Sequence, residues 1–148
     1  MIRNVRHTGL VIRNAVKSRS FYEGLGFVVE KHANESGEFI SHVVGIDDVQ
    51  IETIKMRSPD GSMIELLQYH SHPDRSPQAK PPANKLGCSH LAFTVNSILD
   101  TCRTIEELGG SIVNPPVVSK DGNVSVAYCY DNDGILLEIV EELVVVKK

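Results

Sequence analysis

Two stretches of this chain repeat one pattern, a tight turn followed by a short apolar strand with an acid inside it. They read SPDGSMIELLQY at positions 58–69 and DNDGILLEIVEE at positions 131–142. Each contains an Asp-Gly pair, which favours a hairpin turn because glycine adopts positive φ without strain. In each, a glutamate, Glu65 or Glu138, stands four residues after the glycine and between apolar neighbours. A buried carboxylate is costly unless something pairs with it, so both acids require the same explanation.

The regions before these stretches also correspond, and the chain reads as one βαβββ module written twice. Each module starts with a strand that carries a histidine, His7 or His90, continues through one helix and ends with three strands. The predicted elements of the first module are strands at 5–12, 28–33, 49–57 and 63–69 and a helix at 15–25; those of the second are strands at 88–95, 111–118, 124–131 and 135–141 and a helix at 97–108. We therefore expect an α+β fold in which two tandem βαβββ modules form a curved, mixed-sheet trough.

The first module is longer than the second by about the length of a short helix. The separation between His7 and Glu65 is 58 positions, whereas that between His90 and Glu138 is 48. Within 36–45, strand alternation would divide the apolar side chains between two faces. Helical spacing instead gathers them on one side: Phe39, Ile40, Val43 and Val44. We predict an inserted helix there.

Positions 71–85 separate the two modules. The segment SHPDRSPQAKPPANK contains four prolines and few apolar side chains, which is typical of a linker. We expect the whole chain, 1–148, to form a single domain made of modules 1–70 and 86–148. A linker of this length lets the modules pair within one chain or between two chains.

The overall composition argues against several classes of partner. A formal net charge of −4 and an isoelectric point near 5.8 disfavour nucleic-acid binding, because no basic surface replaces the counterions of the phosphates. No apolar run is long enough to cross a membrane, and the first residues lack the apolar core of a signal peptide. The three cysteines include no close pair, so neither a disulfide framework nor a thiolate zinc site is indicated. We therefore expect a cytoplasmic protein.

The repeated acids and histidines are the candidate functional site: His7, Glu65, His90 and Glu138. If the first and last strands of a module are neighbours in the sheet, its histidine and glutamate share one face. Pairing of the modules would then bring two imidazoles and two carboxylates together. This mixed set suits Zn²⁺, Ni²⁺, Co²⁺, Fe²⁺ or Mn²⁺ and leaves room for water or substrate. A bound cation also explains why the carboxylates tolerate burial.

A single histidine or glutamate on a strand is more often hydrogen-bonded or partly exposed than a metal ligand. Recurrence at matching places in both modules is therefore what carries the metal prediction. His32 and His42 have no counterpart in the second module, and His70 and His72 fall at the linker, where we expect them to be solvated. We assign these four histidines no function, and we expect the cysteines to pack in the core.

Several motifs carry a resemblance to a known family: HTGLVI, FYEGLGF, SPDGSMIELLQY, SHLAFTV, EELGG and DNDGILLEIVEE. They resemble the vicinal oxygen chelate superfamily, which includes glyoxalase I, methylmalonyl-CoA epimerases, fosfomycin-resistance thiol transferases, extradiol dioxygenases and bleomycin-resistance proteins. The resemblance covers nearly the whole chain outside the linker. It implies paired βαβββ modules that enclose one divalent metal ion, and a homodimer. The four candidate residues match the metal-ligand positions of glyoxalase I, whereas the epimerases commonly have Gln at the place of Glu65.

The resemblance implies a metal-dependent lyase or isomerase for a small substrate with two adjacent oxygens, such as an α-keto, α-hydroxy or thioester compound. In this reading the substrate loses a proton to give a metal-stabilised enolate, with Glu138 as the expected base and Glu65 as the second choice. Bacterial glyoxalase I holds glutathione with an Arg at the place of Val11 and an Asn at the place of Tyr69, so glutathione adducts are not the expected substrate here.

The alternative is a non-catalytic protein that sequesters a drug or metabolite, as proteins of the bleomycin-resistance type do. Such binders use an aromatic-lined groove and often lack the metal ligands. The aromatic content of this chain is only 5%, and all four ligand positions are filled, so we rank sequestration second.

Overall fold

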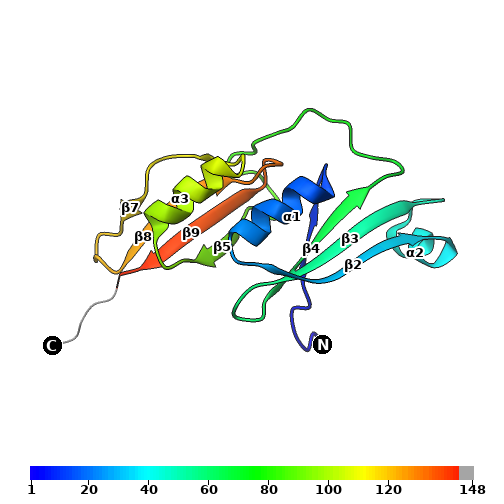
Figure 1. Ribbon diagram of the computed structural model, residues 1–148, viewed down its shortest axis with the longest axis horizontal. Helices are drawn as coiled ribbons and strands as arrows, with labels where there is room; N and C mark the ends of the chain where they lie inside the picture. The colour runs from blue at the N-terminus through cyan, green and yellow to red at the C-terminus, as the bar shows by residue number, and fades with distance from the viewer. Residues whose placement is uncertain (144–148) are drawn as a thin grey trace. The chain divides into compact units, whose positions relative to one another are not determined.

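The computed structural model describes residues 1–143 of the chain, which divides into two compact units, Met1–Ser76 and Pro77–Lys148. Each unit holds one sheet with one long helix on it (Figure 1).

The first unit contains a four-stranded mixed sheet in the order β1-β4-β3-β2. Its elements are β1 (Thr8–Val11), α1 (Ala15–Gly24), β2 (Val28–Ser36), α2 (Glu38–Val44), β3 (Gln50–Arg57) and β4 (Met63–Tyr69). The first strand, β1, runs parallel to the last, β4, whereas β3 is antiparallel to both of its neighbours. First and last strands are therefore neighbours, as the sequence argument required.

The second unit repeats this topology, with the strand order β5-β9-β8-β6 and a short strand β7 that also pairs with β8. Its elements are β5 (Leu91–Thr94), α3 (Ile98–Glu107), β6 (Ser111–Ile112), β7 (Val117–Val118), β8 (Val124–Tyr130) and β9 (Leu136–Glu142). Again the first strand, β5, is parallel to the last, β9. The predicted α+β fold of two βαβββ modules is confirmed.

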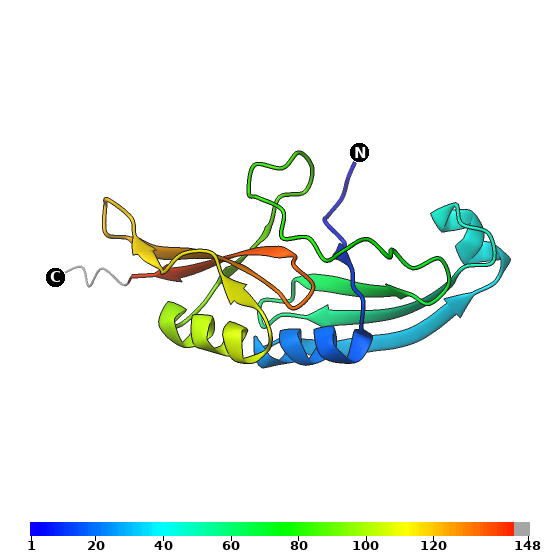
Figure 2. The same cartoon turned by 90° about the horizontal axis from the view of Figure 1, so that it is seen from above.

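Each long helix is attached to its sheet in the same way. The side chain of Asn14 caps α1 by accepting from the Lys17 amide, and that of Ser97 caps α3. The amide of Ala15 donates to Oε1 of Gln68 on β4 at 2.7 Å, and the Ile98 amide donates to a carboxylate oxygen of β9 at the same distance. The hydrogen bond from Ala15 therefore places the side chain of Gln68 on the face of the sheet that α1 covers. Figure 2 shows α1 against this sheet from above.

Strand alternation then decides which residues point away from the helix. On β4, Ile64 and Leu66 lie on the helix side with Gln68 and are buried, so Glu65 points to the opposite face. On β9, Leu137 and Ile139 are buried on the helix side, so Glu138 points to the opposite face as well. The apolar core of each unit thus lies between helix and sheet, and each glutamate faces away from it.

The inserted helix predicted at 36–45 is present as α2, which ends at Gly45 in the left-handed conformation. No residue of α2 is buried, and Phe39 and Val43 on its apolar side are 81% and 61% exposed. These two side chains are exposed because α2 lies beyond the end of the β2–β3 ladder (Figure 1).

The single strand predicted at 111–118 is wrong, because the structure divides it into β6 and β7. Residues 113–116 separate the two pieces and include Pro115 and Pro116, and proline has no amide hydrogen to donate to a sheet. The strands predicted at 5–12 and 88–95 are also shorter than expected, so that His7 and His90 stand immediately before β1 and β5.

The linker at 71–85 forms no helix or strand, yet both of its ends are hydrogen-bonded to the unit beside them. Ser71 Oγ accepts from the Gln50 amide at 2.7 Å in the first unit. Pro81 accepts from the hydroxyl of Tyr130 in the second, and Lys80 donates to Ser111. Among residues 1–143, no helix is long and apolar enough to cross a membrane.

Candidate metal centre

In the first unit, His7 and Glu65 form a direct pair. Nε2 of His7 lies 2.8 Å from Oε2 of Glu65, and the two side chains are 28% and 12% exposed. The pairing follows from the parallel β1–β4 ladder, in which Gly9 stands opposite Glu65. Because residues two apart along a strand share a face, His7 lies on the side of Glu65 and its ring reaches the carboxylate.

The second unit contains the same pair. Nε2 of His90 lies 2.9 Å from Oε2 of Glu138, with the two side chains 28% and 24% exposed. Ala92 stands opposite Glu138 in the parallel β5–β9 ladder, again two residues after the histidine. The four side chains predicted from the sequence thus occur as two equivalent His–Glu pairs, one in each unit.

The donor atoms of each pair suit a shared metal ion. Two ligand atoms about 2.1 Å from one cation and at right angles to each other lie about 3.0 Å apart, close to the 2.8 and 2.9 Å found here. Imidazole nitrogen and carboxylate oxygen are also ligands that Zn²⁺ and its neighbours accept. Within the described residues, no three His, Cys, Asp or Glu side chains of either unit gather around one point, so each pair supplies two ligands at most.

The second ring nitrogen of His7 supports a functional role for this pair. Nδ1 of His7 is buried and has no hydrogen-bond partner in the part of the chain that the structure describes. A buried polar atom without a partner costs stability, so a histidine kept for structure alone would normally satisfy both nitrogens. The contact between Nε2 and Glu65 is therefore the one that orients this ring.

Sequence reasoning did not identify the residues that stand opposite the two glutamates. Lys55 on β3 pairs with Glu65, and its ammonium lies 3.9 Å from Oε1 of that carboxylate. Tyr128 on β8 pairs with Glu138, and its ring lies 5.0 Å from the ring of His90, centroid to centroid. Counting outward from the Asp-Gly turn of each hairpin identifies both partners, because register in a hairpin follows from the turn.

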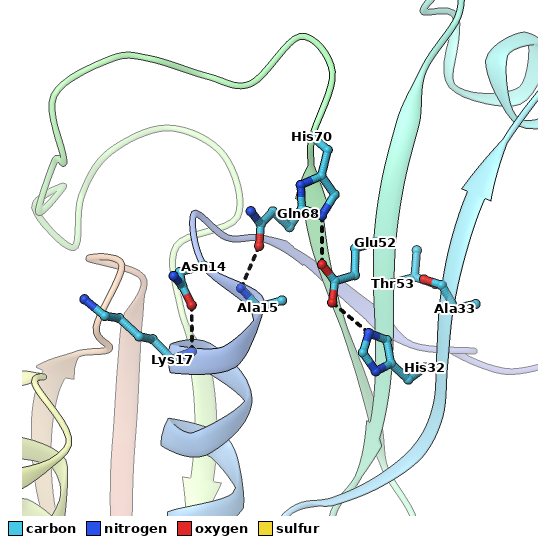
Figure 3. Close-up of polar contacts among 9 residues, drawn as sticks. All are labelled: Asn14, Ala15, Lys17, His32, Ala33, Glu52, Thr53, Gln68 and His70. Atoms are coloured by element: carbon cyan, nitrogen blue, oxygen red, sulfur yellow. Dashed lines mark hydrogen bonds and ion pairs between the residues drawn. The ribbon is translucent and has the colours of Figure 1, made fainter.

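A second group of titratable side chains lies on the other face of the first sheet (Figure 3). Glu52 on β3 is bound by two histidines: Nε2 of His32 is 2.7 Å from its Oε1, and Nε2 of His70 is 2.8 Å from its Oε2. Glu52 stands opposite Gln68, so this group is on the helix side of the sheet, away from Glu65. His70 is 44% exposed and therefore solvated, as expected, and it is also hydrogen-bonded to Glu52, which the sequence did not indicate.

The structure also shows the surroundings of Tyr130 and of the three cysteines. Tyr130 donates its hydroxyl to the Pro81 carbonyl, which occupies its polar end. Of the cysteines, Cys102 and Cys129 are buried, as expected, but Cys88 is exposed. Burial raises the pKa of the Cys129 thiol to about 12 and also raises that of Cys102.

The chain is similar in sequence to a known protein family. Residues 4–139 match the profile of the family described as the Glyoxalase/Bleomycin resistance protein/Dioxygenase superfamily. A protein of Synechocystis named "Probable lactoylglutathione lyase" is 28% identical over 137 residues, which cover 91% of this chain and 92% of that protein.

Solved structures show the same fold. A glyoxalase family protein from Bacillus cereus superposes with a TM-score of 0.90 at 28% identity, over 97% of each chain. The fosfomycin resistance protein FosX from Listeria monocytogenes, described as complexed with Mn(II) and sulfate ion, superposes with a TM-score of 0.63 at 14% identity, over 97% of this chain and 96% of its own.

Proposed function

Because the chain belongs to the Glyoxalase/Bleomycin resistance protein/Dioxygenase superfamily, we propose that it is a divalent-metal-dependent lyase or isomerase of the glyoxalase I-like type. The observation that carries the proposal is the His–Glu pair that recurs at the same register in both units. Two such pairs supply the four ligands of one cation: His7, Glu65, His90 and Glu138.

The ligand set fits Zn²⁺, Ni²⁺, Co²⁺, Fe²⁺ or Mn²⁺. A bound cation of this kind would supply Lewis-acid chemistry, stabilising the negative charge that develops on a carbonyl oxygen of the substrate. The Mn(II) described for FosX supports a metal in this fold, and the lyase name of the Synechocystis relative supports the reaction class. The substrate is a small α-keto, α-hydroxy or thioester compound with two adjacent oxygens.

The reaction needs a base that takes a proton from the carbon next to the carbonyl. We assign this role to Glu138 and the second place to Glu65, because the side chain of Glu138 is the more exposed of the two, at 24% against 12%. The proton passes to the carboxylate and returns to the same carbon or to its neighbour, so no other reactant is consumed. The imidazoles of His7 and His90 would hold the ion and take no part in the proton transfer.

In this proposal the two units act together as one domain, and the active form is a cytoplasmic homodimer. The partner is a small molecule rather than a nucleic acid or a membrane, in keeping with the net charge of −4.

The second candidate function is sequestration of a drug or metabolite without catalysis, which other members of this superfamily perform. The exposed apolar side chains of α2, Phe39 and Val43, favour sequestration because they offer an apolar surface to a ligand. Metal content distinguishes the two: a sequestering protein of this kind should be metal-free after gentle purification, whereas the enzyme should retain about one ion per pair of modules.

The deciding experiment replaces the proposed base, Glu138, by a residue that can still bind the metal. Glu138→Gln retains the size and one oxygen of the side chain but removes its basicity, so turnover should fall by about 10²–10⁴-fold while metal is retained. A substrate from a panel of α-keto, α-hydroxy and thioester compounds is identified first by thermal shift. Exchange of solvent deuterium into the carbon next to the carbonyl should slow by the same factor.

Glu65→Gln is the matched variant and should lower turnover less. If Glu138→Gln turns over at the wild-type rate with its metal in place, Glu138 is not the base.

Glutathione adducts test the substrate class. Val11, two residues along β1 from Gly9, is apolar, and Tyr69 ends β4, so neither offers the cation or the amide that holds glutathione in bacterial glyoxalase I. Turnover of the hemithioacetal of methylglyoxal and glutathione should be weak or absent. A high rate would show that these two positions do not decide the substrate.

A further inference from the structure

We propose that Lys55, assisted by Lys31, binds an oxyanion carried by the substrate, so that the substrate of the site proposed above is an anion. The inference rests on the proposed function and adds the charge of the substrate to it. The observation behind it is one row of side chains that crosses the first sheet.

This row crosses three strands on the face that carries Glu65. Lys31 on β2 stands opposite Lys55 on β3, and Lys55 stands opposite Glu65 on β4. A register shift between Val29 and Lys31 bulges β2 beside the row. Side chains directly opposite each other in a sheet share a face, so both ammonium groups lie on the side of the carboxylate.

Two like charges opposite each other destabilise a sheet unless something compensates for them. Here the row holds two lysines and one carboxylate, and Glu65 is already bound by His7 at 2.8 Å while its distance to Lys55 is 3.9 Å. Lys31 makes no ion pair within residues 1–143. The row therefore has an excess of positive charge.

The charged groups nearest to this row do not remove the excess. Arg57, two residues along β3, is paired with Glu30 in the bulge and also donates to the Gly61 carbonyl at 2.7 Å. The carboxylate of Glu30 is thus already paired with the guanidinium of Arg57 and does not neutralise the lysines. A cation held by His7 and Glu65 would increase the positive charge of the face further, so that an anion is the group required to balance it.

The ammonium of Lys55 is placed to make a specific contact rather than a diffuse one. Its side chain is only 28% exposed and its head group lies beside the carboxylate that the proposed function assigns to the metal. A carboxylate or a phosphoryl group on the substrate, next to its two chelating oxygens, meets this ammonium with a charge-assisted hydrogen bond. The second unit has Tyr128 at the equivalent place, so this lysine row occurs in the first unit and has no counterpart in the second.

The test compares hydroxamates, which chelate metal ions through two adjacent oxygens, with and without an anionic tail. The probes are acetohydroxamate, the monohydroxamate of succinate and a hydroxamate with a phosphonate tail, titrated by calorimetry into metal-loaded protein. We expect the wild type to bind at least one anionic probe about ten-fold more tightly than acetohydroxamate. The two tails distinguish a carboxylate from a phosphoryl ligand.

Substitutions of Lys55 and Lys31 then show whether these residues cause the preference for the anionic hydroxamates. Lys55→Met should reduce the preference to about two-fold and Lys55→Arg should preserve most of it, with unchanged metal content by elemental analysis. Lys31→Met should reduce it by about three-fold, since an exposed charge contributes less. Lys17→Met, on the exposed surface of α1, is the matched control and should leave the preference intact.

Each result decides between the two proposals. If the wild type binds neither kind of hydroxamate, the metal site itself is refuted and the anion site with it. If acetohydroxamate and the anionic probes bind equally well, or if Lys55→Met retains the preference, the metal site stands and the anion site is overturned.

Discussion

Removal of one imidazole from a His–Glu pair should weaken metal binding by a predictable amount. The apparent binding free energy of zinc in four-ligand protein sites is about 10–16 kcal/mol, or about 3–4 kcal/mol for each ligand. His7→Ala deletes one ligand and leaves Glu65 with Lys55 as its remaining neighbour. We expect the dissociation constant for Zn²⁺ to rise by about 10²–10³-fold, and His90→Ala to have an effect of similar size.

The first sheet offers a matched control for this experiment. His70 also places its Nε2 2.8 Å from a glutamate oxygen, that of Glu52, but on the other face of the sheet. His70→Ala therefore removes a comparable hydrogen bond without removing a proposed ligand. Competition against a chromogenic chelator measures all three variants on one scale. The reasoning is refuted if His7→Ala binds Zn²⁺ as the wild type does, or if His70→Ala weakens binding by the same factor.

Three further outcomes follow from the same structure. Dialysis against EDTA should lower the melting temperature by about 5–15 °C, because an ion at 100 to 1,000 times its dissociation constant adds about 3–4 kcal/mol to stability; an unchanged melting curve would contradict this. Ellman's reagent should modify Cys88 rapidly in the native protein, whereas Cys102 and Cys129 are buried with raised pKa values and should react only on unfolding; two or more fast thiols would contradict this. The hydrogen bond from His70 lowers the pKa of Glu52 in the folded protein. The stabilisation is therefore present above the pKa of Glu52 in the unfolded chain and is lost as the pH falls through its pKa in the folded protein. In acid titrations of unfolding, the stability difference between wild type and Glu52→Gln, about 1 kcal/mol or less, should shrink below about pH 4.5.

Much of the candidate site could be predicted from the sequence because it depends on local rules. The Asp-Gly turns and the apolar residues beside Glu65 and Glu138 identify two equivalent last strands. The repeat itself then implies that the first strand of each module carries the matching histidine. A hairpin turn and a two-residue alternation involve only residues that are neighbours in the chain, so both can be recognised in the sequence before the fold is known.

Other features depended on contacts between distant parts of the chain. The helix α2 follows from its own spacing and its glycine stop, but the exposure of Phe39 and Val43 follows from what surrounds it. The tie between His70 and Glu52 likewise requires strands β3 and β4 in their final register. Neither could be predicted from spacing along the chain.

The row of Lys31, Lys55 and Glu65 shows most directly what only the tertiary structure decided. Lys55 faces Glu65 through a hairpin whose register the turn alone defines, so that pairing was open to sequence reasoning. The place of Lys31 beside them was not, because the register of β2 against β3 is set across the inserted helix α2, from Ser36 opposite Gln50 to Lys31 opposite Lys55, and no short turn defines it. Turn chemistry and alternation are properties of short segments, whereas a register across an insertion is set by the packing of the whole sheet.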